Sequence, residues 1–319
     1  MIVSCGEALI DFVPARTTTG ESAYVARPGG SPFNVALTVG RLGVPAGFLG
    51  SISTDFFGAR LVGALQESRV DTRYVLRLDR PSMLAFVNLA AVEPEYAFYD
   101  SGASHRFWAP ERDIGPDVTA LHFGSLSLID PPAAQHFAEL MAREKGRRLV
   151  TLDPNIRPTL VRTEEAAYRA RLSTMLGLAD LIKISGADLA WLDPTCEPAA
   201  SAAAWLAGGT ALVVVTAGAD GSTAYTRDGR TIHRAAEPIK LVDTVGAGDS
   251  FMGALLAGLD ICGVAAPEAL AAADDETLER ILAFAAQVSA ITCSRAGADP
   301  PWRAEVTLPS RAGEVKGTR

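Results

Sequence analysis

Residues 243–258 read Asp243-Thr-Val-Gly-Ala-Gly-Asp249-Ser-Phe-Met-Gly-Ala-Leu-Leu-Ala-Gly258. Three small residues precede the carboxylate of Asp249 and an apolar run, which predicts a glycine turn that opens onto a buried helix. The first N–H groups of a helix have no internal partner, and together with the helix dipole they bind anions such as phosphate. Asp249 would repel a phosphate but could take a proton from an attacking hydroxyl. The stretch therefore predicts phosphoryl transfer to an alcohol.

The same stretch is compatible with a simpler role. Asp249 or Ser250 could serve only as the helix N-cap, a role that these residue types favour in any protein. A Walker A loop needs Gly-Lys-Ser/Thr after its spacer, and no lysine follows Gly248 here. Residues 6–11 lack the further glycines of a dinucleotide fingerprint. The N-cap alternative stays open at this point.

A second motif lies near the N-terminus. Residues 28–36 read Pro-Gly-Gly-Ser-Pro-Phe-Asn-Val-Ala, and Arg-Leu-Gly (41–43) and Gly-Ser-Ile-Ser-Thr-Asp-Phe-Phe-Gly (50–58) follow. With Asp-Thr-x-Gly-Ala-Gly-Asp-x-Phe at 243–251, the chain resembles the ribokinase-like (PfkB-type) carbohydrate kinases. Within this family, Gly-Glu-Ala-Leu-Ile-Asp at 6–11 and Asp-Pro-Asn-Ile-Arg-Pro at 153–158 resemble the bacterial fructokinases, and kinases for 2-keto-3-deoxygluconate share the latter stretch. The resemblance extends from Gly6 to about Gly297. It implies a three-layer α/β/α fold with a mostly parallel central sheet and a small antiparallel β lid.

The composition is that of an ordinary globular chain. It has 319 residues, 48% of them hydrophobic and 21% charged, enough for a sizeable core. The formal net charge is −8, without the clustered Lys and Arg of a nucleic-acid surface. We expect a single kinase domain over residues 1–319 that has a small-molecule sugar as its partner and no nucleic acid.

No membrane partner or secretory signal is expected. Residues 1–6 lack a basic start and read as a strand, and residues 198–219 divide into an alanine-rich helix and a valine-rich strand. The four cysteines, Cys5, Cys196, Cys262 and Cys293, are scattered, which is typical of reduced, buried thiols. We therefore expect a cytoplasmic protein.

Strand-like and helix-like segments alternate along the chain, which favours a mostly parallel sheet covered by helices on both faces. The expected strands are 2–4, 46–50, 120–123, 149–152, 181–184 and 211–216. The expected helices are 34–42, 57–67, 133–144, 164–176, 187–192, 200–207, 249–257 and 278–293. Residues 12–27 and 73–107 instead show the period-2 alternation of half-buried antiparallel strands, and we assign them to the lid.

The resemblance also implies the sugar-binding residues, namely Asp11, Gly29, Gly30, Asn34, Phe98 and Arg157. A carboxylate and an amide suit a vicinal diol, because together they accept and donate hydrogen bonds. In the lid, alternation puts Tyr96 and Phe98 on the same face of a strand and Tyr99 on the opposite one. Which face meets the sugar stays open.

For catalysis, we expect Asp249 as the general base and the Gly246, Ala247 and Gly248 amides as an anion hole. The resemblance implies ATP and Mg²⁺ as cofactors, with K⁺ as a candidate further cation. It places the nucleotide at Lys183, Ser185, Thr216, Gly218, Gly221 and Gln287. Asp188 stands where the family usually carries a glutamate that helps to organise Mg²⁺, and it could equally be an ordinary residue of the first helical turn. Asp243 resembles an element of the monovalent-cation site.

The preferred acceptor is fructose, giving fructose 6-phosphate. The alternative is 2-keto-3-deoxygluconate, whose carboxylate Arg157 could bind in a bidentate manner. Kinases for that acid resemble one another in a second arginine after a lid tyrosine, and Asp100 stands there in this chain. Its negative charge would repel an acidic substrate.

Two further alternatives carry less support. A nucleoside acceptor is not expected, because the Asp-Pro-Asn-Ile-Arg stretch at 153–157 is untypical of adenosine kinases. A sugar- or nucleotide-binding regulatory protein without catalysis would not need the intact Asp249 and its glycine turn. Lid strands with exposed edges could pair between two subunits, so a homodimer through the lid is plausible.

Overall fold

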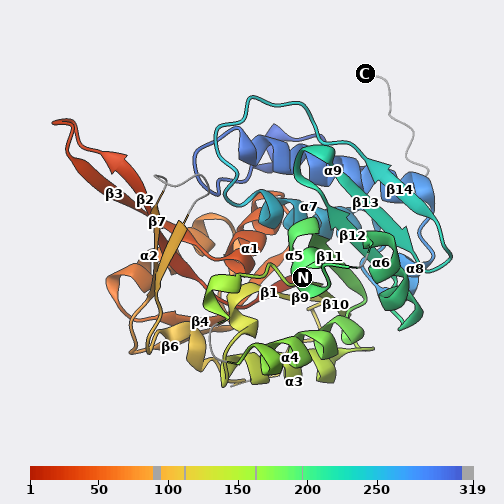
Figure 1. Ribbon diagram of the computed structural model, residues 1–319, viewed down its shortest axis with the longest axis horizontal. Coiled ribbons are helices and arrows are strands. Elements are labelled where there is room, and N and C mark those ends of the chain that lie inside the picture. Colours follow the sequence, from red (N-terminus) through yellow and green to blue (C-terminus); the bar gives the residue numbers. More distant parts are fainter. Residues whose placement is uncertain (89–94, 111–112, 162–163, 196, 311–319) are drawn as a thin grey trace.

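The computed structural model describes residues 1–88, 95–110, 113–161, 164–195 and 197–310 (Figure 1). Within these ranges a ten-stranded sheet runs in the order β14-β13-β12-β11-β10-β9-β1-β4-β5, and β6 also pairs with β4. Its strands are β1 (Ile2–Cys5), β4 (Ala46–Ser53), β5 (Val70–Asp71), β6 (Val75–Leu78), β9 (Ala120–Gly124), β10 (Leu149–Asp153), β11 (Leu181–Ser185), β12 (Leu212–Thr216), β13 (Ser222–Thr226) and β14 (Thr231–Arg234).

The strands from β12 to β5 pair in parallel, as the alternation of segments predicts. All six expected strands are present, with ends that agree within a few residues. At one end of the sheet, β13 and the edge strand β14 pair in antiparallel fashion, and neither strand was predicted. They lie within a polar stretch, where short hairpin strands give little periodic signal.

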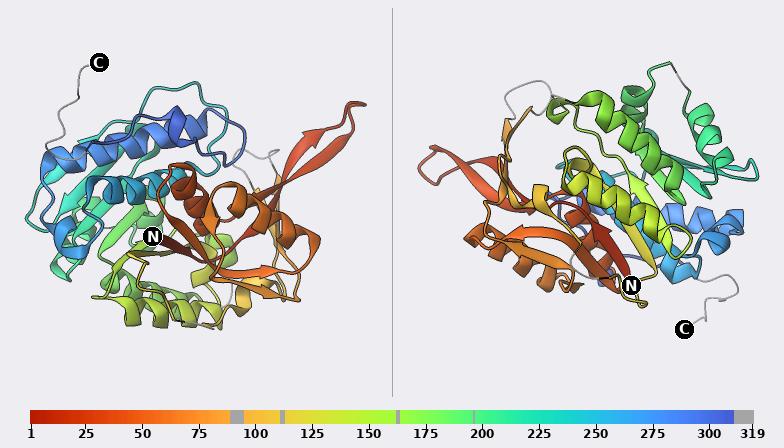
Figure 2. Two further views of the ribbon diagram at one scale, coloured as in Figure 1. Left: turned by 180° about the vertical axis from the view of Figure 1, so that it is seen from behind. Right: turned by 90° about the horizontal axis from the view of Figure 1, so that it is seen from below.

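The helices cover both faces of the sheet (Figures 1 and 2). They are α1 (Ser31–Arg41), α2 (Phe56–Glu67), α3 (Ala133–Glu144), α4 (Glu165–Leu178), α5 (Gly186–Leu192), α6 (Pro198–Ala207), α7 (Ala247–Cys262), α8 (Pro267–Ala271) and α9 (Asp275–Cys293). One core lies between the sheet and α1, α7 and α9, and a second lies between the sheet and α3 and α4. The three expected layers are therefore confirmed, and of these helices only the short α8 was missed.

A smaller sheet stands beside the body, and its β2–β3 hairpin projects outward at the upper left of Figure 1. Its order is β3-β2-β7-β8, with β2 at Leu9–Arg16, β3 at Ser22–Gly29, β7 at Met83–Asn88 and β8 at Glu95–Tyr99. The pairs β2–β3 and β7–β8 are antiparallel as expected, whereas β2 and β7 run parallel.

The expected second lid segment, residues 73–107, is too wide. Strand β6 falls inside it but pairs with β4 of the central sheet, and only β7 and β8 belong to the lid. Period-2 alternation marks a half-buried strand without telling which sheet the strand joins. Residues 89–94 of this segment, like Cys196, lie outside the described residues.

The sequence of α7 explains where this helix begins and ends and why its body is buried. Gly246 is its N-cap with φ 76°, a left-handed conformation that glycine adopts without steric cost. At the other end Gly263 has φ 78°, and its N–H donates to Asp260 O while the Val264 N–H donates to Leu259 O. These bonds satisfy carbonyls of the last turn, and the nearly all-apolar body of the helix is buried.

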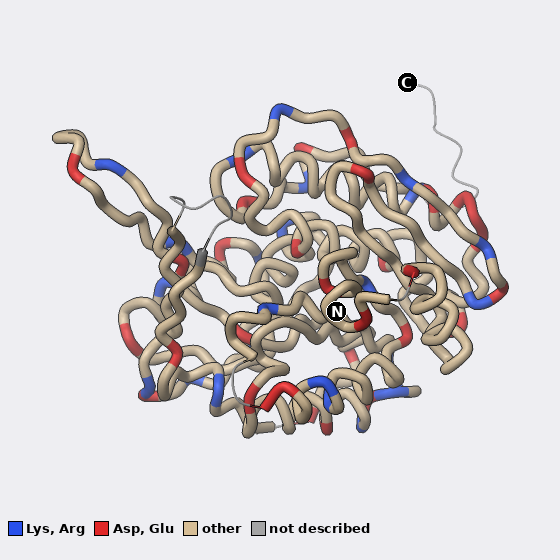
Figure 3. The backbone as a smooth tube through the Cα atoms, viewed as in Figure 1, with Lys and Arg blue, Asp and Glu red and all other residues tan. Residues whose placement is uncertain are grey.

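Acidic and basic residues are interspersed along the described backbone (Figure 3). Among the described helices, none combines the length and apolar character needed to span a bilayer.

Candidate active site

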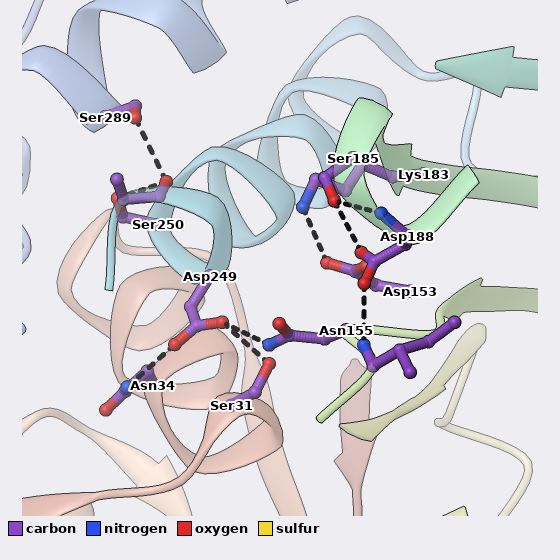
Figure 4. A network of polar contacts seen from close by, with 12 residues as sticks. Ser31, Asn34, Asp153, Asn155, Lys183, Ser185, Asp188, Asp249, Ser250 and Ser289 are labelled. Carbon is purple, nitrogen blue, oxygen red and sulfur yellow. Dashed lines mark hydrogen bonds and ion pairs between the residues drawn. The ribbon is translucent and has the colours of Figure 1, made fainter. Parts of the chain in front are cut away.

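Asp249 lies in the first turn of α7, and its carboxylate turns toward α1 (Figure 4). It is 8% exposed. One oxygen accepts from Ser31 Oγ at 2.6 Å and from Asn155 Nδ2 at 3.3 Å, and the other accepts from Asn34 Nδ2 at 2.8 Å. The N-cap residue is Gly246, so the alternative that Asp249 only caps the helix is wrong. Three neutral donors instead hold a carboxylate that no cation contacts directly in the described chain.

The glycine turn is sterically restricted at two positions. A Cβ on Gly246 would lie 2.5 Å from Ala298 Cβ, and one on Gly248 would lie 3.1 Å from Lys183 Nζ. The Ala247 N–H donates to Thr244 O at 3.2 Å, so it helps to close the turn. In the described chain the Gly246 and Gly248 amides have no such backbone acceptor. These two amides are the better candidates for an anion hole.

A cavity of about 230 Å³ opens in front of Asp249. Its wall includes Asp11, Gly30, Asn34, Phe98 and Arg157, all of which the sequence assigned to the sugar. Gly246 and Gly248 also reach this wall. Gly29, which the resemblance also assigns to the sugar, is not part of the described wall. A Cβ at this position would lie 2.1 Å from Asp11 Oδ2. Its missing side chain makes room for that carboxylate.

The cavity carries more acid than base. Burial, and then the nearby charge of Asp249, raise the pKa of Asp11 to about 7, while Arg157 acts in the opposite direction. Glu7, a further wall residue, is fully buried, and burial raises its pKa as well. Among the described wall residues, three carboxyl groups face one guanidinium.

Three residues of this site were not assigned from the sequence, namely Glu7, Ser31 and Asn155. Ser31 and Asn155 belong to motifs that were quoted, but nothing in the spacing showed that both would donate to Asp249. Glu7 is a charged residue within an apolar stretch, and this feature could have identified it as a candidate site residue. Its Oε2 accepts from the Ser127 N–H at 3.1 Å, and its Oε1 has no partner in the described structure.

The structure decides which lid face meets the cavity. Tyr96 and Phe98 line it together with Val87 of the neighbouring strand. Tyr99 lies on the opposite face, is 64% exposed and packs edge-on against Phe86 with ring centroids 5.5 Å apart.

The prediction that Asp100 repels an acidic substrate is wrong. Arg106 Nη1 contacts Asp100 at 2.7 Å and Asp130 at 2.9 Å, so Asp100 is ion-paired and shares this guanidinium with Asp130. These three residues line a separate small cavity of about 30 Å³. They are absent from the described wall of the 230 Å³ cavity in front of Asp249. Any preference against an acidic sugar must come from the acidic wall itself.

A second cavity of about 600 Å³ lies on the other side of the glycine turn. Its wall contains Thr216, Gly218 and Gly221, three of the residues that the resemblance assigns to the nucleotide. Thr244 and Gly248 line both cavities, so the two spaces meet at the start of α7. A two-substrate site joined at an anion-binding turn suits the transfer of a phosphoryl group.

The chain matches the description "pfkB family carbohydrate kinase" over residues 1–305. The protein belongs to this kinase family. It is 40% identical over 280 residues to a fructokinase of Rhizobium leguminosarum bv. trifolii, covering 87% of this chain and 85% of that relative. Among solved structures it is similar to a Xylella fastidiosa fructokinase with bound ATP, at 31% identity and a TM-score of 0.86 over 93% of both chains. It is also similar to the fructose-, ADP- and calcium-bound fructokinase of Vibrio cholerae O395, at 26% identity and a TM-score of 0.79 over 93% of this chain and 94% of that one.

Gln287 of this carbohydrate kinase is absent from the described wall of the 600 Å³ cavity. Its Oε1 accepts from the Thr307 N–H at 3.2 Å, so it ties α9 to the C-terminal segment. The same helix lines the cavity with Ala286, Ser289, Ala290 and Cys293. The helix lies where the sequence predicts it, but Gln287 lies on a face of the helix that does not line this cavity.

Lys183, Ser185 and Asp188 lie outside the described walls of both cavities. Figure 4 shows them grouped with Asp153. Lys183 is buried and contacts Asp153 at 2.8 Å, an opposite charge that raises its pKa against the effect of burial. Ser185 caps α5 by accepting from the Asp188 N–H. The Asp188 carboxylate accepts from Ser185 Oγ at 2.7 Å and from the Ile156 N–H at 2.9 Å.

The carboxylates expected near metal ions are bound by protein groups. Asp188 has both oxygens in the bonds just described. Asp243 accepts from the Val245 N–H at 3.0 Å and from the Gly297 N–H at 2.8 Å, which shapes the loop before α7. Within the described ranges, no group of three or more His, Cys, Asp and Glu residues could hold a metal ion. Described side chains alone therefore do not form a metal centre here.

Proposed function

We propose that this protein is an ATP-dependent fructokinase that converts fructose to fructose 6-phosphate. The observation that carries the proposal is the meeting of two cavities at Thr244 and Gly248, with Asp249 at the sugar side of the junction. The fructokinase relatives, one of them solved with ATP and one with fructose and ADP, support this choice of substrates.

In the reaction, Asp249 takes the proton of the attacking sugar hydroxyl. The hydroxyl oxygen forms a bond to the γ-phosphorus while the bond from that phosphorus to the β–γ bridging oxygen breaks, and ADP leaves with the bridging oxygen. The Gly246 and Gly248 amides face the negative charge on the transferred group, with Ala247 holding the turn. Ser31 and Asn34 keep the carboxylate oriented through the bonds at 2.6 and 2.8 Å.

Fructose is favoured over 2-keto-3-deoxygluconate by the charge of the cavity. A carboxylate substrate would enter a space with three carboxyl groups and one guanidinium, and water exclusion would strengthen the repulsion. A neutral ketose meets acceptors at Asp11 and a mixed donor and acceptor at Asn34. Tyr96 and Phe98 of the lid would cover its apolar face.

The nucleotide fits the larger cavity, with its phosphates toward the N-terminus of α7. We propose Mg²⁺ as the ion that would accompany the nucleotide. When bound, the ion neutralises phosphate charge. We place a K⁺ site beside the loop that Asp243 orders, and a double mutant of the V. cholerae enzyme is described with potassium.

Two broader assignments belong to the same proposal. The outer face of the lid carries Tyr24, 51% exposed, and Tyr99, 64% exposed, which suits a homodimer formed through the lid. Scattered free thiols at Cys5, Cys262 and Cys293 suit the cytoplasm.

The test is ADP release with Mg-ATP and, in turn, fructose, glucose, ribose, 2-keto-3-deoxygluconate or adenosine. We expect turnover with fructose to exceed that with any other acceptor. Preferred turnover of 2-keto-3-deoxygluconate would show that Arg157 binds a carboxylate despite the acidic wall. Fructose binding in a calorimeter without ADP release from any acceptor would instead support a regulatory sugar-binding protein.

A further inference from the structure

Arg157 lines the sugar cavity but has no obvious task in a kinase for a neutral sugar. Its best contact is with the protein, because Nη1 donates to Asn155 Oδ1 at 2.6 Å. The same nitrogen lies 3.2 Å from Ile156 O and 3.4 Å from Asn155 O. The guanidinium thus folds back over the loop that follows β10.

This contact decides the orientation of the Asn155 amide. A guanidinium can only donate hydrogen bonds, so the oxygen of the amide must face Arg157. The NH₂ group then faces the other way, where Asn155 Nδ2 lies 3.3 Å from Asp249 Oδ1 (Figure 4). An amide turned by 180° would place its oxygen against the carboxylate and its NH₂ against the guanidinium, and both contacts would be repulsive.

The backbone of Asn155 also needs to be held. Its φ is 40°, in the left-handed region that asparagine adopts more readily than most other residues with a side chain. On one side the Ile156 N–H is bound to Asp188 at 2.9 Å, and on the other Arg157 caps the two loop carbonyls. The loop is therefore fixed from both ends with its amide aimed at Asp249.

We propose that Arg157 and Asn155 form a positioning relay, in which Arg157 sets the direction of the Asn155 amide and the amide sets the position of the Asp249 carboxylate. This inference rests on the proposed kinase reaction. The relay gives Arg157 a role that does not require a charged substrate. It also explains why an arginine is compatible with a neutral sugar in this acidic cavity.

A double-mutant cycle separates this role from direct contact between Arg157 and the sugar. Arg157→Met removes the donors and keeps an unbranched side chain, and Asn155→Gly removes the amide while tolerating the left-handed backbone. Each single change should lower kcat about tenfold, the typical loss of one hydrogen bond to a charged group, with the fructose KM within about twofold. In the Asn155→Gly background, Arg157→Met should cost less than about twofold, because the relay is already broken.

Two controls accompany the cycle. Arg157→Lys keeps a donor and should recover most of the kcat lost in Arg157→Met. Arg147→Gln changes an exposed arginine after α3 and should leave kcat unchanged. An undiminished effect of Arg157→Met in the Asn155→Gly background, or an effect on the fructose KM alone, would overturn the relay in favour of direct sugar binding.

A readout without substrate keeps the inference separate from the proposed function. In ¹⁵N-labelled protein, the Asn155 side-chain NH₂ pair can be assigned by its loss in Asn155→Gly. In Arg157→Met its shifts should move and its exchange with water should accelerate, whereas Arg147→Gln should leave it unchanged. Unchanged NH₂ signals in Arg157→Met would refute the relay, even in a protein that turned out to phosphorylate another sugar.

Discussion

The cavity proposed for the sugar and the cavity proposed for the nucleotide share the start of α7 but differ in chemistry. The smaller one, about 230 Å³, has Glu7, Asp11, Asp249 and Arg157 in its wall. The larger one, about 600 Å³, has Glu237 as the only charged residue of its described wall, which otherwise consists mainly of small and apolar residues.

The contrast follows from what each ligand presents. A sugar offers hydroxyl groups on every side, so its site needs many directed donors and acceptors. A purine offers a flat apolar face, so alanine, isoleucine and leucine side chains can hold it without charge. Only the phosphoryl group is common to both ligands, and the shared wall at Thr244 and Gly248 consists of turn and helix N-terminus. Changes on one side should therefore affect one substrate, and changes at the junction should affect turnover.

The largest effect is expected at the junction. Asp249→Asn keeps the shape of the side chain but removes the base, and kcat should fall by about 10³-fold. Steady-state ADP release at saturating fructose and ATP measures this change. Asp260→Asn, near the other end of α7, is the matched control and should retain full kcat. Turnover close to that of the unmodified kinase in Asp249→Asn would remove Asp249 from the role of base.

A smaller effect is expected in the sugar cavity alone. Asp11→Asn removes a charged acceptor, and the fructose KM should rise about 10- to 100-fold because hydrogen bonds to charged groups are worth about 1.5–3 kcal/mol. The ATP KM should stay unchanged, since Asp11 is not part of the described nucleotide wall. Initial rates over a matrix of both substrates give the two constants. A parallel rise in the ATP KM would show that the two cavities are not independent.

A substitution in the larger cavity should affect the ATP KM and leave the fructose KM nearly unchanged. Ala290→Phe fills space beside the base-binding wall, so the ATP KM should rise about tenfold while the fructose KM changes less than about twofold. Gln287→Ala on the same helix is the control, because Gln287 faces Thr307 instead of the cavity. If Gln287→Ala raised the ATP KM as much as Ala290→Phe, the assignment of the helix face would be wrong.

A further effect is expected on the free energy of unfolding and on its dependence on pH. The pKa of Asp11 rises from 3.8 to about 7 on folding, mainly through burial, so the folded state binds the proton more tightly than the unfolded state. Its contribution to stability is therefore full below about pH 4 and is lost as the pH rises through 7. Asp11→Asn removes this loss and should be more stable than the unmodified protein at pH 8 by up to about 4 kcal/mol, the limit set by a pKa shift of about three units, with a smaller or opposite difference at pH 4.

Urea unfolding of both proteins at the two pH values measures this difference. A gap in the free energy of unfolding that is the same at pH 4 and pH 8 would mean that Asp11 does not titrate with a raised pKa. It would also weaken the contrast between the two cavities, because the acidic character of the sugar site would then carry little energetic cost.

Much of the architecture was predictable, because its signals are local. Strand β9 and helix α3 lie where their apolar periodicity predicts, since burying one face of a regular element needs a repeating pattern. The glycine turn was predictable for a similar reason, as Gly246 adopts a conformation that few other residues tolerate. Strand β6 was assigned to the wrong sheet, because alternation reports burial and not the identity of the neighbouring strand.

The sequence by itself determined the family and the glycine turn before α7, since these depend on residue types at short spacing. The tertiary structure alone decided which side chains share a cavity. It placed Asp100 with Arg106, turned Gln287 toward Thr307 and brought Asn155 to Asp249 from 94 residues away. Contacts of this kind depend on how the elements and loops pack in three dimensions, and neither periodicity nor motif spacing specifies them.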